Sequence, residues 1–225
     1  MTNKTNYKGD KKMDGLDLVI PTVESSGNAA TMQLPDIDLY NYWNLYNNRI
    51  LTVDGEITDW DYSVVKSILQ INMADRKIDV KDRKPIILLV NSPGGLLDVT
   101  NSIIDAVSIS TTPVWTVNMG SALSGGCLVY LAGERRFATT NSWAMTHSGS
   151  GSTSGTYDES VEQKKVWDEQ VKNMGAYIVG RTGIDEKLWN KNKKKDWWLD
   201  CEKQLELGFA TDKLESLDQI LRVER

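Results

Sequence analysis

Ser124 and His147 are the residues of this chain whose types and surroundings could form a hydrolytic site. Ser124 lies in GSALSGGCLVYLAG, where a strand-like apolar run passes through small residues into an apolar helical pattern. A hydroxyl acts as a nucleophile when it has a base beside it and N–H donors where the oxyanion forms. His147 is the only histidine, so an imidazole base must be this residue. A lone histidine at a strand end is more often structural, and Ser121 is a rival nucleophile.

Two glycine-rich turns could supply the oxyanion donors. At a strand-to-helix elbow, the helix N-terminus adds partial positive charge and free N–H groups beside Ser124, which makes Gly125 the first candidate donor. The sequence NSPGG follows the apolar run IILLV and opens another helical pattern. Because the carboxyl ends of parallel strands share one edge of a sheet, this turn and Ser124 can meet. Gly95, or less favourably Gly94, is then the second donor, although such turns also occur without function.

Short apolar runs alternating with amphipathic stretches predict the elements that position these residues. We expect strands at 49–53, 85–90, 113–117 and 143–147, and helices at 62–74 and 96–108. Near-continuous apolar strands followed by helices are typical of a mainly parallel sheet that is buried on both faces. The predicted fold class is therefore α/β.

A long helical pattern follows the glycine–serine segment that comes after His147. Its apolar stripe, from Tyr157 to about Gly180, comprises Val161, Trp167, Val171, Met174 and Ile178. We expect this helix to contact other copies of the chain, with packing inside the monomer as the alternative. Further on, Asp200 is a candidate N-cap for a helix at 201–207 that Gly208 ends.

The composition excludes several other classes of protein. The chain has 225 residues and a net charge of −5, without a basic patch interleaved with aromatic residues, which argues against a nucleic-acid partner. Cys127 and Cys201, with a single histidine, fit neither a disulfide framework nor a zinc site, so we expect a cytoplasmic protein. The apolar run at 16–20 is too short for a signal peptide or a membrane span. Residues 1–35 form a polar, flexible N-terminal arm in this interpretation, and residues 36–225 form a single domain.

Three motifs in order make the chain resemble the Clp protease proteolytic subunit from about residue 36 to 217. They are NSPGG, then GSALSGG about 25 residues later, then NSWAMTH. The resemblance implies that Ser124 is the nucleophile and His147 the base. It also implies that Asp196, in KNKKKDWWLD after Thr182-Gly183, completes the triad, with Asp185 and Asp200 as rivals.

The resemblance carries further expectations about fold and partners. It implies a ClpP/crotonase-type spiral of ββα units with a protruding handle helix at about 157–180. The expected activity is that of a serine endopeptidase cutting unfolded polypeptides inside a homo-oligomer, a heptamer or double heptamer. An AAA+ Clp unfoldase would be the ATP-consuming partner, and the peptidase would need no metal or organic cofactor.

Several positions depart from the family pattern. Ser148-Gly149 stands where members usually have Gln-Pro, and Lys194-Lys195 replaces an acidic–Arg pair that bridges two rings. Ile87 and Leu89 replace aromatic residues that help to dock the unfoldase. These departures favour, as an alternative, a phage-type or ATPase-independent processing protease. Alternatives of another class are a crotonase-type acyl-CoA hydratase or isomerase and an inactive ring scaffold.

Three clusters have less specific interpretations. The lysine-rich run at 191–195 is more often a solvated face than a phosphate site. Trp197-Trp198 is expected to pack near a ring interface, and Cys127 to be a small core residue.

Overall fold

The computed structural model describes residues 37–221, and the chain divides into two units between Asn48 and Arg49. In the first unit, helix α1 (Ile37–Asn47) buries none of its residues, and its rings of Tyr42, Trp43 and Tyr46 contact one another. The predicted arm, residues 1–35, lies outside the described residues. Every candidate site residue belongs to the second unit.

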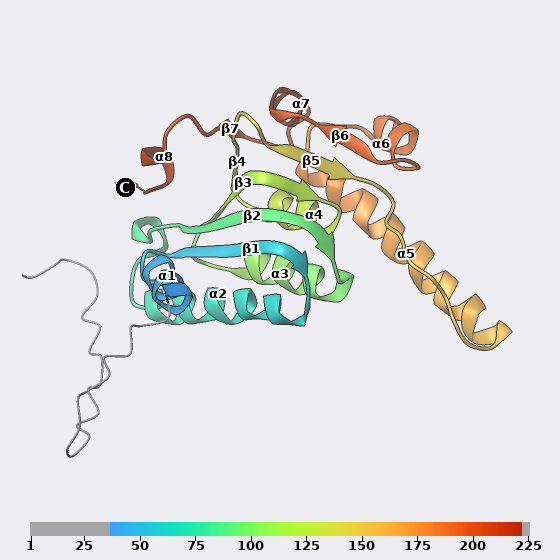
Figure 1. The fold of residues 1–225 in the computed structure, drawn as a ribbon, viewed down its shortest axis with the longest axis horizontal. Coiled ribbons are helices and arrows are strands. Elements are labelled where there is room, and N and C mark those ends of the chain that lie inside the picture. Colours follow the sequence, from blue (N-terminus) through green and yellow to red (C-terminus); the bar gives the residue numbers. More distant parts are fainter. Residues whose placement is uncertain (1–36, 222–225) are drawn as a thin grey trace, which may run out of the picture. The chain divides into compact units, whose positions relative to one another are not determined.

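A seven-stranded sheet is the centre of the second unit (Figure 1). Neighbouring strands follow the order β1 (Ile50–Ile57), β2 (Ile86–Gly95), β3 (Val114–Leu123), β4 (Arg135–Ala138) and β7 (Asp212–Lys213). β5 (Trp143–Thr146) pairs with the last residues of β3, and β6 (Trp197–Leu199) pairs with β5. Only the β5–β6 pair, among the strands of residues 37–221, is antiparallel. The predicted α/β class is confirmed.

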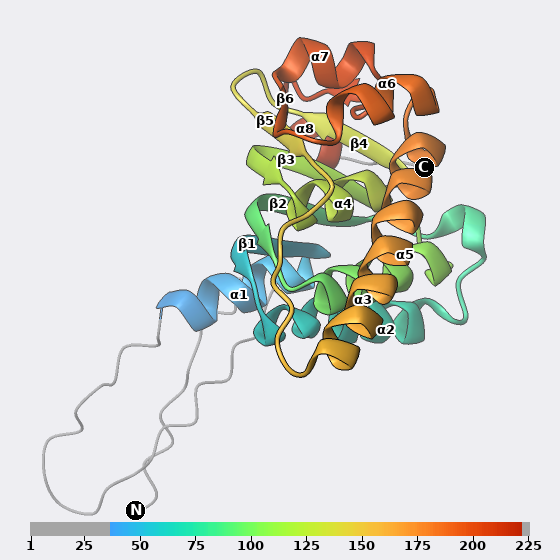
Figure 2. The same cartoon turned by 90° about the vertical axis from the view of Figure 1, so that its right-hand side faces the viewer.

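Three helices cover one face of the sheet. α2 (Tyr62–Asp75), α3 (Leu97–Ile109) and α4 (Gly125–Ala132) lie against the same face (Figures 1 and 2). The later helices are α5 (Tyr157–Arg181), α6 (Glu186–Asn192), α7 (Cys201–Glu206) and α8 (Asp218–Leu221), with short 3₁₀ turns at Asp59–Asp61 and Val80–Asp82. Helices α2, α3 and α5 begin and end within one residue of the helices predicted at 62–74, 96–108 and 157 to about 180.

Both faces of the central strands are buried, as the apolar runs predict. In β2, Ile86, Leu88 and Val90 are fully buried, and Ile87 is nearly so. On the face opposite α2–α4, a core cluster joins Ile87, Trp115, Val117, Phe137, Leu214 and Ile220. The face that carries α2–α4 is also shielded from solvent, because every residue of α4 is buried. A rigid core therefore holds both ends of α4 in place.

Strands β2 and β3 are longer than predicted. The sequence NSPGG was expected to be a turn, but β2 continues through it to Gly95, after a register shift between Val90 and Ser92. Its polar and small residues hide the strand pattern, and positive φ angles of 98° and 156° at Gly94 and Gly95 bend its end. The short strands β4, β6 and β7 also escaped prediction.

Helix α5 has an exposed N-terminal half and a packed C-terminal half. Thr156 caps it, with Glu159 accepting a hydrogen bond from the Thr156 N–H at 2.7 Å. Its buried residues, Gly175 and Ile178, both lie near the C-terminal end, while the N-terminal half extends away from the sheet (Figure 1). No helix within residues 37–221 is long and apolar enough to cross a membrane.

Candidate active site

Ser124 lies at a sharp corner between β3 and α4. Its backbone has φ 51° and ψ −120°, a conformation that is rare for a residue other than glycine and costs on the order of 1–3 kcal/mol. The Ser124 N–H donates to the Met145 carbonyl at 2.8 Å, which ties the corner to β5. Helix α4 begins at the next residue, so its free N–H groups lie beside the serine. The predicted strand-to-helix elbow is therefore present.

Strand pairing brings His147 to the serine. β5 lies parallel to β3 with Leu123 opposite Met145, so that the residue after β5 lies near the residue after β3. The Ser124 Oγ and the His147 Nε2 are 2.8 Å apart, and the His147 side chain is 19% exposed. Among residues 37–221, no other hydroxyl forms a hydrogen bond with the imidazole, so the rival Ser121 is not placed for activation.

The antiparallel β5–β6 pair places Asp196 on the other side of the imidazole. Thr146 pairs with Trp197, so His147, the residue after β5, faces Asp196, the residue before β6. The His147 Nδ1 and the Asp196 Oδ1 are 3.5 Å apart, longer than the usual hydrogen-bond range of about 2.7–3.2 Å. The Asp196 side chain is 57% exposed, and the Ser148 N–H donates to the Lys193 carbonyl at 2.9 Å just beyond this contact.

The rival carboxylates have other partners. Asp185 caps α6 by accepting from the Leu188 N–H at 2.7 Å. Asp200 caps α7 by accepting from the Lys203 N–H at 2.8 Å, as predicted. The carboxylate that lies beside the imidazole is therefore Asp196.

The two glycine segments meet at the serine. A Cβ built on Gly94 would lie 2.8 Å from both the Gly125 nitrogen and the Ser124 Cβ, and one on Gly125 would lie 3.5 Å from the Gly95 nitrogen. The Gly94 N–H already donates to Ser92 Oγ at 3.0 Å. Gly95 and Gly125 are thus better placed than Gly94 to offer N–H groups to a substrate oxygen.

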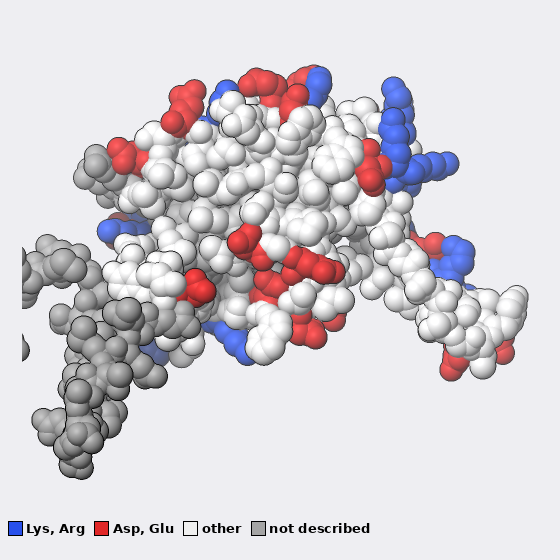
Figure 3. All heavy atoms as spheres, in the orientation of Figure 1, with Lys and Arg blue, Asp and Glu red and all other residues white. Residues whose placement is uncertain are grey.

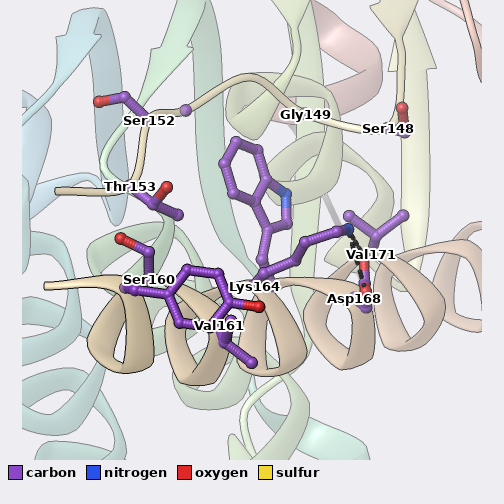
Figure 4. A pocket seen from close by; sticks show the side chains of 12 residues that line it. Ser148, Gly149, Ser152, Thr153, Ser160, Val161, Lys164, Asp168 and Val171 are labelled. Carbon is purple, nitrogen blue, oxygen red and sulfur yellow. Dashed lines mark hydrogen bonds and ion pairs between the residues drawn. The ribbon is translucent and has the colours of Figure 1, made fainter.

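Two neighbouring cavities run along this site. The first, of 820 Å³, contains Ser124, His147 and Asp196 and has apolar walls that include Leu128 and Met174. The second, of 760 Å³, lies between α5 and the segment 148–153, and its walls include the Lys164–Asp168 ion pair (Figure 4). The cavities share Ser148, Gly149, Gly151, Ser152, Trp167 and Val171. The two cavities therefore adjoin each other along α5 and the segment 148–153.

Cys127 and the lysine-rich run at 191–195 have the ordinary roles that the sequence favours, a core residue and a solvated face. Cys127 is fully buried, and burial raises the pKa of its thiol to about 12, so it is not a competing nucleophile. Lys and Arg side chains gather over α6 and the turn after it (Figure 3). Lys191, Lys193, Lys194 and Lys195 form no ion pair with any described residue, as expected for a solvated face.

Two buried hydroxyls support the glycine segments, and the sequence analysis did not identify them. Besides holding the Gly94 N–H, Ser92 has its carbonyl 2.8 Å from where a Cβ on Gly126 would lie. Thr100 donates to the Leu96 carbonyl at 2.8 Å, and its Oγ1 would lie 2.7 Å from a Cβ on Gly125. The only signal in the sequence was that Ser92 lies within a motif; Thr100 follows an ordinary helical pattern.

Comparison with known proteins agrees with this geometry. The family model described as Clp protease matches residues 36–216. The ATP-dependent Clp protease proteolytic subunit 2 of Treponema pallidum is 31% identical over 170 residues, which are 74% of this chain and 82% of the relative. The proteolytic subunit of Streptococcus mutans is 28% identical over 78% of this chain and 89% of its own length. A solved structure of a ClpP1 mutant from Listeria monocytogenes superposes with a TM-score of 0.64 at 23% identity, covering 78% of this chain and 96% of that one, and shows the same fold.

Proposed function

Since the chain belongs to the Clp protease family, whose members are serine peptidases, we propose that it cuts polypeptides with Ser124, His147 and Asp196 as its catalytic triad. The observation that carries this proposal is the 2.8 Å contact between the Ser124 Oγ and the His147 Nε2, within a cavity that also holds Asp196. The family membership sets aside the acyl-CoA hydratase or isomerase alternative.

Each residue has a defined part in the proposed reaction. The Ser124 Oγ attacks the peptide carbonyl carbon while the His147 Nε2 takes its proton. The carbonyl oxygen becomes an oxyanion that accepts from the Gly95 and Gly125 N–H groups. The C–N bond then breaks as the imidazolium delivers the proton to the leaving amine, and a water molecule hydrolyses the acyl-enzyme by the same route.

Asp196 has the orienting part in this scheme. Its carboxylate holds the Nδ1 proton of His147, so that Nε2 faces the serine, and it stabilises the imidazolium. At 3.5 Å and 57% exposure the contact is loose, and such contacts often shorten when substrate binds. No metal or organic cofactor is required by this chemistry.

We extend the proposal to the assembly and its partners. The exposed half of α5 supports a homo-oligomer, a heptamer or double heptamer, in a cytoplasmic setting consistent with two free cysteines. An AAA+ Clp unfoldase would feed unfolded chains to it.

One observation favours the ATPase-independent variant as a second candidate. Ile87, at a docking position of the family, is 3% exposed and packs in the cluster with Leu214 and Ile220. This covering would leave little of its side chain for a partner. Degradation of a folded, tagged substrate in the presence of a Clp ATPase and ATP would support the unfoldase partner, and no stimulation would favour the variant.

Hydrolysis of an N-blocked fluorogenic peptide and of an unfolded protein tests the peptidase itself. We expect Ser124→Ala and His147→Ala to abolish hydrolysis, whereas Ser121→Ala retains it. A folded wild-type protein that cuts neither substrate would favour the inactive scaffold instead.

A further inference from the structure

The C-terminal end of α4 is held by side chains from two other elements. The last carbonyls of a helix have no partner within it. Here the Arg181 guanidinium, from the last turn of α5, donates to the Leu131 carbonyl at 2.8 Å and to the Ala132 carbonyl at 3.2 Å. It also donates to the Gly133 carbonyl, which receives a further bond from Arg136 at 3.3 Å. α4 and α5 lie side by side at this point (Figure 2).

These two arginines bring positive charge without a balancing carboxylate at hydrogen-bonding distance. Within residues 37–221 neither forms an ion pair, and Arg136 also donates to the Phe209 and Gly208 carbonyls. Burial, and then the neighbouring charge of Arg181, lower the pKa of Arg136. The two like charges oppose each other, although each is favourable beside the carbonyl end of a helix, so both contribute positive potential at this end of α4.

The other end of α4 carries the proposed nucleophile. α4 has eight residues, all buried, and begins directly after Ser124. At a rise of about 1.5 Å per residue its two ends are about 12 Å apart. The negative end of the α4 dipole lies beside the two arginines, whose charges neutralise it. The positive end consists of the free N–H groups at the start of the helix, which include the Gly125 N–H.

We propose that Arg181 is a positioning residue for the peptidase reaction, which holds the C-terminal carbonyls of α4 and adds positive potential along this helix toward the oxyanion that forms at Ser124 and Gly125. This inference rests on the proposed function. Acting over about 12 Å at an effective dielectric constant of about 20, one charge alters a rate constant about tenfold. Because the oxyanion develops in the transition state, the effect belongs to kcat rather than to KM.

The test compares kcat and KM for a fluorogenic peptide per active site, with sites counted by fluorophosphonate titration. We expect Arg181→Gln to lower kcat about tenfold with KM changed less than twofold, and Arg181→Lys to restore most of kcat because it keeps the charge. Arg76→Gln is the matched control, since it removes the same charge at the exposed C-cap of α2 and should leave kcat unchanged. Tyr177→Phe removes an uncharged contact to α4, the 3.1 Å bond to the Leu128 carbonyl, and should change kcat less than threefold.

A purely structural role gives a different pattern. Arg181→Gln would then unfold at lower temperature, while kcat per titrated site stayed at the wild-type value, and that result would overturn the inference. Should Arg181→Gln not fold, Arg181→Met, which keeps the apolar length of the side chain, is held to the same tenfold criterion. A wild-type protein that neither reacts with the probe nor cuts peptide would overturn the proposed function itself, which distinguishes that failure from this one.

Discussion

Replacing Gly94 with alanine perturbs the proposed oxyanion donors most directly. Gly94 has φ 98°, and a Cβ there would lie 2.8 Å from the Gly125 nitrogen and 2.9 Å from the Leu123 carbonyl oxygen. These are backbone atoms that cannot rotate aside, so the two glycine segments must separate. The backbone conformation alone costs about 1–3 kcal/mol of stability. Displacing one oxyanion donor costs about 10²- to 10³-fold in kcat.

A matched substitution separates these two effects. Gly55 has φ 82°, and a Cβ on it would meet nothing within 4 Å, so Gly55→Ala carries the backbone strain without the collision. Chemical denaturation should show a loss of stability in both variants, larger in Gly94→Ala because the collision adds to the backbone strain. In steady-state peptide hydrolysis, only Gly94→Ala should lose kcat by 10²-fold or more. Equal kcat values for Gly94→Ala and Gly55→Ala would refute the placement of the oxyanion donors.

Four further predictions follow from contacts of the described residues. Asp196→Asn should lower kcat/KM on the order of 10- to 10³-fold, as expected for a charge 3.5 Å from His147 at an effective dielectric constant between 80 and 20, and unchanged kinetics would exclude its orienting part. Hydrogen bonding to Arg49 lowers the pKa of Asp75, so its stabilisation is complete at neutral pH and is lost as the pH falls below about 4. Asp75→Asn should therefore cost about 1–3 kcal/mol at pH 7 by urea denaturation, because the pair with Arg49 is only partly buried. The stability of this variant should also fall less between pH 5 and pH 3 than that of the wild type, and an equal fall would contradict this assignment. Because the pKa of Cys127 is about 12, iodoacetamide at pH 8 should modify Cys127 only after unfolding, as peptide mapping would show, and modification of the folded protein would argue against its burial. Native mass spectrometry should give seven or fourteen copies of the chain, and a stable monomer with full activity would contradict the proposed assembly.

The parts of the site that depend on local pattern could be predicted from the sequence. The apolar runs ahead of NSPGG and GSALSGG indicated parallel strands whose carboxyl ends meet, and Ser124 and Gly125 indeed lie beside Gly94 and Gly95. The capping role of Asp200 also followed from local pattern. Such features depend on neighbours in the chain, so the chain itself carries their signal.

The remaining features depend on pairing between distant segments. Asp196 is placed by β6, a strand of three residues that is too short to leave an alternating pattern, so its position came from the resemblance alone. The arginine cap on α4 joins residues about fifty positions apart in the sequence, and nothing near Arg181 marks it. The extension of β2 through NSPGG was missed for a related reason, because pairing with its neighbours overrides the turn preference of Pro93 and Gly94.

Covalent labelling with a fluorophosphonate probe, followed by peptide mapping, is the most direct test of the site. The probe reacts only with a serine hydroxyl that has a base beside it and donors for the developing charge. We expect one adduct per chain, on Ser124, that disappears in His147→Ala and persists in Ser121→Ala. An adduct on Ser121, or an equal rate of labelling in folded His147→Ala, would contradict it.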